Sequence, residues 1–307
     1  MDQETFLNLP TEEIADLVRE RGPRVCVFPI NGTRRWFMLE HADAAEQTPE
    51  TYLDIAGRRH VELYRLFFDH GIEILLTPIF GPDILKRGTS YAPIIESGLT
   101  WFARNQVFLD FYEDYDVRVS VYGDAAGYLR ETTYEDALAA FETLEERTTS
   151  HQHYRLLFGV CAHDAAETVA NIGVRFHQKH GRLPTKREII ETYYSEYIPP
   201  VDLFIGFDRP AVFDMPLVAN GNEDLYFMVS PSPYLETNTL RRILYDHLYA
   251  RRIDDADYNS LKATDLEMLR RFYYQNRQSV LGLGRRQLED SVWLPYPQVE
   301  AIERFEI

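Results

Sequence analysis

Short apolar runs alternate with longer segments of helical spacing along most of this chain. Six runs of five to seven residues are rich in aliphatic and aromatic side chains: 24–30, 72–77, 117–122, 155–160, 201–205 and 225–229. Helical spacing marks 12–20, 52–70, 91–115, 134–147, 165–180, 185–194, 239–252 and 264–274. Almost continuously apolar strands that alternate with helices are typical of a parallel sheet buried on both faces. The pattern therefore predicts an α/β fold with one doubly wound, mostly parallel, six-stranded sheet flanked by helices.

The chain is strongly acidic, which narrows the choice of partners. Its 307 residues include 32 Lys and Arg against 49 Asp and Glu, a formal net charge of −17. Nucleic acids and anionic membrane surfaces both require a basic face, so neither is an expected partner. No stretch approaches the roughly 18 apolar residues of a membrane span, and the first residues lack the features of a signal peptide. We expect one domain over residues 1–307, in the cytoplasm and without stable membrane insertion, and we expect Cys26 and Cys161 to be buried thiols.

The strongest local signal is the segment Phe28-Pro-Ile-Asn-Gly-Thr-Arg-Arg-Trp36, which follows the first predicted strand. Open α/β sheets bind ligands at the carboxyl ends of their strands. A glycine lets backbone approach a ligand closely, backbone N–H groups near a helix start favour an anion, and Arg34 and Arg35 offer fork-shaped donors that match phosphate oxygens. These residues predict a phosphate or diphosphate site. A surface turn whose arginines pair with acidic neighbours is the alternative, and the acidic stretch 41–50 is a candidate flexible loop beside it.

The same segment carries a family resemblance. Asn31-Gly-Thr-Arg-Arg-Trp36 resembles the Asp-Gly-Asn-x-Arg-Trp signature of the cis-prenyltransferases. Within that superfamily, the chain is most similar to a branch of diterpene synthases that make tuberculosinol-like and kolavelool-like alcohols. The similarity runs in one order from about Phe6 to about Gly284 and includes His70-Gly-Ile-Glu73, Thr77-Pro-Ile-Phe80, Tyr122-Gly-Asp124, Pro184-Thr-Lys-Arg-Glu-Ile-Ile190, Asp202-Leu-Phe-Ile-Gly-Phe207 and Thr239-Leu-Arg-Arg-Ile-Leu-Tyr-Asp-His247.

The resemblance implies a fold of the undecaprenyl diphosphate synthase type, a long hydrophobic tunnel and, usually, a homodimer. It implies that the substrate is a bicyclic twenty-carbon allylic diphosphate, supplied by a separate cyclase. The diphosphate leaves, and water or a nucleoside captures the allylic cation. On this basis Asn31, Gly32, Thr33, Arg34 and Arg35 are expected to bind the diphosphate. Tyr52 and Tyr64, twelve residues apart on one predicted helix, resemble tyrosines that face the reacting centre; without the resemblance, packing would be the expected role of each.

Three positions depart from the family pattern. Asn31 replaces the aspartate whose carboxylate serves the magnesium-bound diphosphate, and a neutral amide is a weaker Mg²⁺ ligand. We still expect Mg²⁺ as cofactor. Three consequences of Asn31 stay open: the metal is held chiefly by the diphosphate, Asn31 donates a hydrogen bond to the diphosphate instead, or catalysis is lost. Gly206 replaces an arginine of the elongating enzymes, which argues against a second diphosphate substrate. Asp224 occupies the place of their metal-binding glutamate, so it is a candidate metal ligand or an exposed acid at the start of a strand.

We therefore expect an enzyme, a terpene synthase or diphosphate lyase of cis-prenyltransferase fold. It would ionise a bicyclic diterpenyl diphosphate of the kolavenyl or tuberculosinyl type and release a tertiary alcohol and diphosphate. Asn31, Arg34, Arg35, Tyr52 and Tyr64 are the expected catalytic residues. Two alternatives stay open: a transferase that gives the diterpenyl group to adenosine, and a non-catalytic subunit of prenyltransferase fold.

Overall fold

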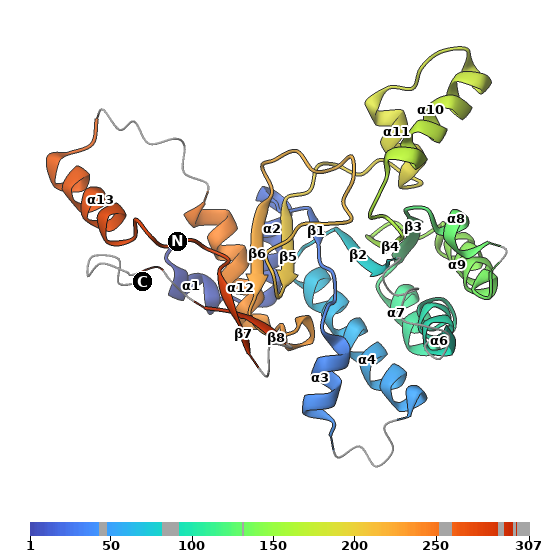
Figure 1. The fold of residues 1–307 in the computed structure, drawn as a ribbon, viewed down its shortest axis with the longest axis horizontal. Helices are drawn as coiled ribbons and strands as arrows, with labels where there is room; N and C mark the ends of the chain where they lie inside the picture. Colours follow the sequence, from blue (N-terminus) through green and yellow to red (C-terminus); the bar gives the residue numbers. More distant parts are fainter. Residues whose placement is uncertain are drawn as a thin grey trace.

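A central sheet of six parallel strands organises the protein, as a computed structural model shows (Figure 1). The structure describes residues 1–42, 48–81, 92–130, 132–251, 260–287, 292–296 and 299. The strands are β1 (Val25–Val27), β2 (Ile74–Phe80), β3 (Val117–Tyr122), β4 (Tyr154–Val160), β5 (Leu203–Phe207) and β6 (Asp224–Met228), in the spatial order β3-β4-β2-β1-β5-β6. All five neighbouring pairs are parallel. The predicted sheet is confirmed, and each predicted run overlaps one of these strands.

Helices surround this sheet, and several were not expected from the sequence. The described helical elements are α1 (Gln3–Leu7), α2 (Thr11–Arg21), α3 (Thr33–Glu40), α4 (Pro49–Asp69), α6 (Ala92–Arg104), α7 (Gln106–Asp114), α8 (Ala125–Leu129), α9 (Glu135–Thr148), α10 (Ala166–His180), α11 (Lys186–Tyr193), η2 (Ser232–Tyr234), α12 (Thr237–Tyr245), the π-helical η3 (Asp246–Ala250) and α13 (Ala263–Gln275). An antiparallel hairpin of β7 (Gly284–Gln287) and β8 (Val292–Pro295) follows α13. Among the helices that are described, none has the length and apolar character needed to cross a membrane.

The two faces of the sheet bury different sets of side chains. Cys26 and Phe28 belong to a large cluster that includes side chains of α2, α4, α7, α9 and α12. Val25 and Val27 point to the other face, into a smaller cluster with side chains of α10 and α11. Alternate residues of a strand point to opposite faces, so β1 is buried on both sides. Figure 1 shows α10 and α11 projecting from one end of the sheet and α13 from the other.

The acidic stretch 41–50 is only partly visible, because residues 43–47 lie outside the described residues. At its end, the Thr48 side chain accepts a hydrogen bond from the Thr51 amide at 3.2 Å, and Pro49 is the first residue of α4. A threonine cap followed by proline is a favourable helix start. Helix α4 therefore begins three residues before the predicted Tyr52, and this start determines where its pocket-facing side chains lie.

Arg241 of α12 joins the amino-terminal segment to the end of α4. Its guanidinium donates to the carbonyl oxygens of Leu7 and Leu9 at 2.8 and 2.9 Å and to the Thr11 hydroxyl at 2.8 Å. Its Nε lies 3.3 Å from Nε2 of His70. One charged side chain thus satisfies two backbone carbonyls and a buried imidazole, and it ties α1, α2, α4 and α12 together.

His70 is held neutral by these contacts. Its ring is 2% exposed, and Nδ1 lies 2.8 Å from the Leu66 carbonyl oxygen. Nδ1 must carry the proton to donate to that carbonyl, so Nε2 is the acceptor for Arg241. Burial lowers the pKa of His70 and the charge of Arg241 adds to the shift, against the opposing effect of the Leu66 hydrogen bond.

Arg241→Met should lower the free energy of unfolding by about 2–4 kcal/mol, because it leaves buried polar groups without partners. The neighbouring Arg242→Met is the matched control, since Arg242 is exposed and should change stability by less than about 0.5 kcal/mol. Urea unfolding of the three proteins measures both values. Equal stability of all three would show that the Arg241 contacts contribute nothing net.

The free energy of unfolding should decrease at acidic pH because of two neutral histidines, the half-buried His60 of α4 and the buried His70 that caps its C-terminal end. Burial lowers the pKa of His60 to about 4. At a pH below the unfolded-state pKa of about 6.5, the histidine is protonated in the unfolded chain but stays neutral in the native protein. The free energy of unfolding therefore decreases as the pH falls from about 6.5 toward 4. The His60 contribution to this loss is roughly 2–3 kcal/mol. Between these pH values, His60→Phe should lose less free energy of unfolding than wild type; equal losses in the two proteins would contradict the assignment.

Candidate active site

Gly32 forms the turn between β1 and α3 in a conformation that suits glycine. Its φ is +77°, in the left-handed region. A Cβ at this position would lie 2.8 Å from Cε1 of Phe207 and 2.9 Å from Cβ of Pro231. Both the backbone angle and the close packing therefore exclude larger residues. The turn lies at the carboxyl end of the sheet, next to the ends of β5 and β6.

Ser232 fixes the same turn by three hydrogen bonds. Its hydroxyl donates to the Pro29 carbonyl oxygen at 3.1 Å and accepts from the Asn31 amide at 3.1 Å. Its own amide donates to the Asn31 carbonyl oxygen at 3.0 Å. The serine is fully buried, so these bonds are shielded from water. The backbone of residues 29–32 is thereby held in one geometry before any ligand binds.

Helix α3 begins at this turn without a side-chain cap. Its first intrahelical bond runs from the Trp36 amide to the Gly32 carbonyl oxygen at 2.9 Å, and no side chain caps the first turn. Within the described residues, the amides of Thr33, Arg34 and Arg35 have no acceptor. Free amides at a helix start, together with the helix dipole, favour an anion. The start of this eight-residue helix therefore offers free hydrogen-bond donors to a group of the size of a diphosphate.

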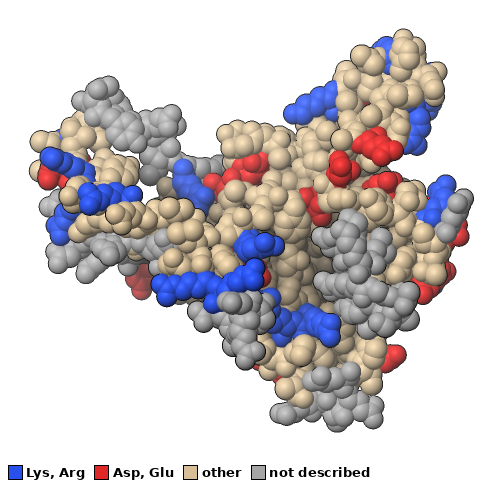
Figure 2. Space-filling view, in the orientation of Figure 1, with Lys and Arg blue, Asp and Glu red and all other residues tan. Residues whose placement is uncertain are grey.

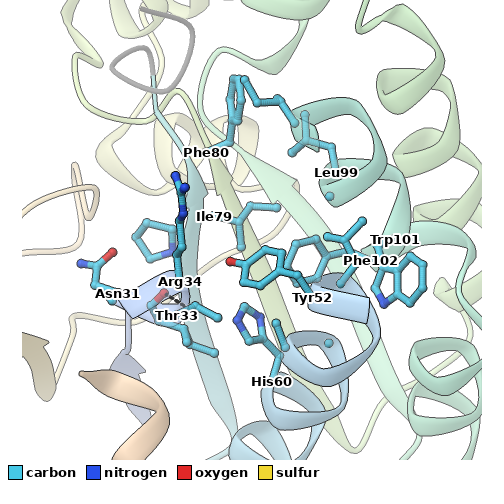
Figure 3. A pocket seen from close by; sticks show the side chains of 18 of the residues that line it. Asn31, Thr33, Arg34, Tyr52, His60, Ile79, Phe80, Leu99, Trp101 and Phe102 are labelled. Carbon is cyan, nitrogen blue, oxygen red and sulfur yellow. Dashed lines mark hydrogen bonds between the residues drawn. The ribbon is translucent and has the colours of Figure 1, made fainter. Parts of the chain in front are cut away.

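The two arginines of α3 differ in how they are held. Arg34 makes no ion pair with any residue described, and Figure 3 shows it reaching from α3 toward Ile79 and Phe80. Arg35 lies over the Phe207 ring at 5.3 Å, with Nη2 3.7 Å from Oδ2 of Asp208. Figure 2 shows Lys and Arg side chains gathered over α3 and the β7–β8 hairpin, which carries Arg285 and Arg286. A locally basic face thus exists on an acidic protein.

A cavity of about 510 Å³ opens directly onto the start of α3. This volume lies in the range of roughly 300–1,000 Å³ typical of small-molecule sites. Its walls come from the β1 turn, the end of β2 and helices α3, α4, α6 and α7, and most are apolar or aromatic. They are Ile30, Asn31, Gly32, Thr33, Arg34, Arg35, Tyr52, Leu53, Ala56, Gly57, His60, Pro78, Ile79, Phe80, Ile95, Gly98, Leu99, Trp101, Phe102 and Phe108.

Six of the expected site residues meet in this cavity: Asn31, Gly32, Thr33, Arg34, Arg35 and Tyr52. Tyr52 is half-buried, with its ring edge-on to Phe37 at 5.2 Å, and Figure 3 shows its hydroxyl directed into the cavity. The Thr33 hydroxyl donates a hydrogen bond of 3.3 Å to the Ile30 carbonyl oxygen. The structure thus brings cationic donors and an aromatic ring together at one opening.

Tyr64 and Asp224 lie elsewhere. Tyr64 is fully buried beneath the cavity, stacked with Phe111 at 6.0 Å. Asp224 is the first residue of β6, at the amino end of the parallel sheet, so it lies at the opposite end from Asn31. Its carboxylate pairs with Nδ1 of His247 at 2.6 Å and with Arg251 at 3.6 Å. The structure does not bring Asp224 and Asn31 together within this chain.

Among the cavity residues that the sequence did not predict, His60 and Trp101 stand out. His60 lines the cavity, and its two ring nitrogens are buried without a hydrogen-bond partner among the residues that the structure describes. Trp101 packs directly on α4, where a Cβ on Gly57 would lie 2.5 Å from the indole Nε1. Tyr52, Ala56, Gly57 and His60 share one face of α4 at helical spacing. The two small residues Ala56 and Gly57, between Tyr52 and His60 on this face, are the sequence signal that indicates a cavity beside the helix.

The residues of the site do not build a metal centre on their own. Within the described ranges, no three His, Cys, Asp or Glu side chains gather as a metal-binding group. Asn31 offers a neutral oxygen, and the nearby Asp208 is already paired with Arg35. Mg²⁺ commonly keeps few protein ligands and takes the rest from substrate phosphates and water. The donor set therefore fits Mg²⁺ only as an ion held mainly by the diphosphate.

Gly206 of β5 leaves no room for the arginine of elongating enzymes. A Cβ there would lie 2.9 Å from Cε1 of Phe204 and 3.0 Å from Cδ1 of Phe227. These rings fill the space that a longer side chain would need. The position therefore carries no guanidinium, and that no second diphosphate binds beside β5 stays a prediction.

Comparison with known proteins agrees with this arrangement. No protein-family model matches the chain. The chain is 41% identical over 295 residues to a protein from Mycobacterium tuberculosis (strain CDC 1551 / Oshkosh) named tuberculosinyl adenosine transferase, covering 95% of this chain and 98% of that one. It is 29% identical over 301 residues to a (+)-kolavelool synthase of Herpetosiphon aurantiacus, covering 97% of this chain and 96% of the other.

Solved structures show the same fold at much lower identity. A lavandulyl diphosphate synthase from Lavandula x intermedia, in complex with dimethylallyl diphosphate, superposes with a TM-score of 0.57 at 15% identity, covering 77% of this chain and 97% of that one. A probable undecaprenyl diphosphate synthase from Campylobacter jejuni gives 0.52 at 13% identity, covering 75% and 97%. The expected fold is confirmed, and since both relatives are enzymes, the non-catalytic alternative is set aside. The chain belongs to the family of tuberculosinyl adenosine transferase, enzymes of the prenyltransferase and terpene synthase type on a cis-prenyltransferase fold.

Proposed function

We propose that this enzyme ionises a bicyclic diterpenyl diphosphate of the kolavenyl or tuberculosinyl type and captures the allylic cation with water, releasing a tertiary diterpene alcohol and diphosphate. The observation that carries the proposal is the direct junction of an apolar cavity of about 510 Å³ with the uncapped, arginine-bearing start of α3. A prenyl diphosphate matches these two features, because it consists of an apolar hydrocarbon and an anionic diphosphate group.

Ionisation is assisted where the charge of the leaving group develops. The amides of Thr33, Arg34 and Arg35 and the guanidinium of Arg34 are in place before the substrate binds, because Gly32 and Ser232 fix the turn. Donors preorganised around a departing anion lower the barrier without reorganisation during the reaction. Asn31 contributes an amide that can donate to a diphosphate oxygen. A Mg²⁺ ion held mainly by the diphosphate would neutralise part of its charge, and Asn31 is the residue that would offer it a protein oxygen.

The allylic cation is stabilised by the aromatic interior of the cavity, away from the start of α3 where the diphosphate binds. Tyr52, Trp101 and Phe102 present aromatic rings to the cavity, and the negative faces of such rings attract a cation. Apolar walls also exclude bulk water, which would otherwise quench the intermediate without control.

Transfer of the same cation to adenosine is the second candidate function. It is favoured by the 41% identical relative, whose name specifies this acceptor. Both reactions share ionisation and differ in the nucleophile. Purified protein, a panel of bicyclic diterpenyl diphosphates, and mass spectrometry with and without adenosine separate the two: an alcohol indifferent to adenosine supports the synthase, and a prenylated nucleoside supports the transferase.

The proposal includes a cellular setting. One catalytic domain over residues 1–307 would work in the cytoplasm on a substrate from a separate cyclase. A homodimer is supported by exposed apolar side chains near the carboxyl end, since α13 buries none of its residues and Tyr273, Tyr274 and Leu281 are 58%, 67% and 82% exposed. Sedimentation of the purified protein as a monomer would contradict the dimer.

Arg34→Gln should lower kcat/KM for diphosphate release by about 10²–10³-fold, the effect of removing one donor to a developing anion. Arg35→Gln should lower it less, because Arg35 already shares its charge with Asp208. Arg58→Gln is the matched control, since Arg58 lies exposed on α4 and pairs with Asp54 at 3.1 Å. If Arg34→Gln and Arg58→Gln release diphosphate equally fast, the diphosphate does not bind at α3.

Tyr52 should act through its ring more than through its hydroxyl. Tyr52→Phe keeps the aromatic face and should retain most of the rate of ionisation. Tyr52→Leu removes the cation–π interaction and should slow ionisation by about tenfold or more. Single-turnover measurement of diphosphate release isolates this step. Equal rates for the two variants would assign Tyr52 a packing role.

A further inference from the structure

Three neighbouring polar side chains lie at or beneath the wall of the cavity, and among the described residues their buried polar atoms have no hydrogen-bond partner; of the three, His60 lines the cavity itself. They are His60 of α4, Tyr64 one turn further along α4, and Thr77 of β2; we refer to them as the polar floor. The buried atoms His60 Nδ1 and Nε2, Tyr64 Oη and Thr77 Oγ1 have no hydrogen-bond partner within the described residues. Each buried polar atom of this kind costs about 1–3 kcal/mol. The Tyr64 and Thr77 hydroxyls lie close enough to interact with each other, so the two His60 nitrogens are the atoms that most need a ligand.

The three side chains are neighbours. The His60 and Tyr64 rings lie 6.2 Å apart, centroid to centroid. The Tyr64 hydroxyl lies beside that of Thr77, which offsets part of the rise in pKa that burial causes for Tyr64. Pro78 and Ile79, which follow Thr77, line the cavity, as does the His60 ring (Figure 3). The polar floor therefore borders the space that holds the hydrocarbon part of the substrate.

The chemistry of the polar floor suits a single water molecule. A neutral imidazole nitrogen accepts a hydrogen bond, the tyrosine hydroxyl donates one, and the threonine hydroxyl does either. A buried water typically makes about three such bonds to groups that are otherwise unsatisfied. Burial keeps His60 neutral, with a pKa near 4, so it does not repel a carbocation. Cationic groups are confined to the mouth, at Arg34 and Arg35.

We propose that the polar floor binds the water molecule that captures the allylic cation, and that His60 is the base that takes its proton. The inference rests on the proposed function. The water oxygen forms a bond to the tertiary carbon of the cation, whose carbon–oxygen bond to diphosphate has already broken. The resulting oxonium gives one proton to a ring nitrogen of His60. The imidazolium then loses that proton to solvent or to the departing diphosphate, so charge and atoms balance.

The polar floor also explains how one product is favoured. A cation in an apolar pocket can lose a proton to give a diene hydrocarbon, or it can bond to a nucleophile. A water molecule held by three groups is poised for the second route, whereas bulk water is excluded by the aromatic walls. The polar floor thus decides the ratio of alcohol to hydrocarbon and leaves ionisation to the α3 site.

The test compares His60→Phe, Tyr64→Phe and Thr77→Val with wild type in two readouts: the rate of diphosphate release and the ratio of alcohol to hydrocarbon. The expected result is release close to the wild-type rate, with an alcohol fraction that falls by about tenfold or more in His60→Phe. Tyr112→Phe is the matched control. Its hydroxyl is equally buried but bonds to the Phe102 carbonyl oxygen at 3.0 Å, outside the polar floor.

An unchanged ratio in all three variants, with release intact, would overturn the inference and leave the proposed function standing. Failure of wild type to release diphosphate from any bicyclic substrate would instead overturn the proposed function. A high-resolution crystal structure gives a readout that does not depend on activity. Density for a water within hydrogen-bond distance of His60 and the Tyr64 hydroxyl supports the inference, and a well-ordered polar floor without it overturns the inference.

Discussion

The left-handed turn at Gly32, at a position where a Cβ would clash with the Phe207 ring, precedes the first residue of helix α3, and the start of α3 determines where an anion can bind. The left-handed turn brings the end of β1 against the ends of β5 and β6, and Ser232 fastens it through three hydrogen bonds. This point is also where the strand order reverses, since the chain runs from β1 to β2 on one side and returns to β5 on the other. The sheet topology thus creates the crevice, and one glycine allows the helix start to face into it.

From this start the site divides by polarity. The amides of α3, Arg34 and Arg35 lie at the mouth, whereas the interior is lined by aromatic and aliphatic side chains with the neutral His60 among them. An allylic diphosphate separates into an anion and a cation when it ionises, so a site that keeps its positive charges at one end stabilises both products. A protonated histidine in the interior would undo this separation, and burial prevents it. The placement of charge therefore follows from which residues are buried.

Much of this architecture could be predicted from the sequence, for identifiable reasons. The strands could be predicted because burial on both faces leaves continuous apolar runs. Residues 31–35 could be placed at one opening because glycine and paired arginines after a strand have a specific chemistry. Helix α3 was missed because no capping side chain marks its start. His60 was missed because a lone histidine in an amphipathic helix has no distinctive spacing. The separation of Asp224 from Asn31 follows from the parallel register of β5 and β6, which local sequence does not reveal.

The replacement of arginine by Gly206 connects the fold to the fate of the cation. Elongation requires a second diphosphate held beside the first, and the rings of Phe204 and Phe227 occupy the space where its arginine would stand. In the proposed reaction, no arginine at position 206 holds a charged co-substrate beside β5 when the diphosphate leaves. The proposed nucleophile is therefore neutral and either small enough to sit in the pocket or able to enter through its mouth. Water in the polar floor meets the first condition, and a nucleoside at the mouth meets the second. The acceptor is therefore decided by which position the nucleophile occupies when the carbon–oxygen bond breaks, and by the groups that hold it there.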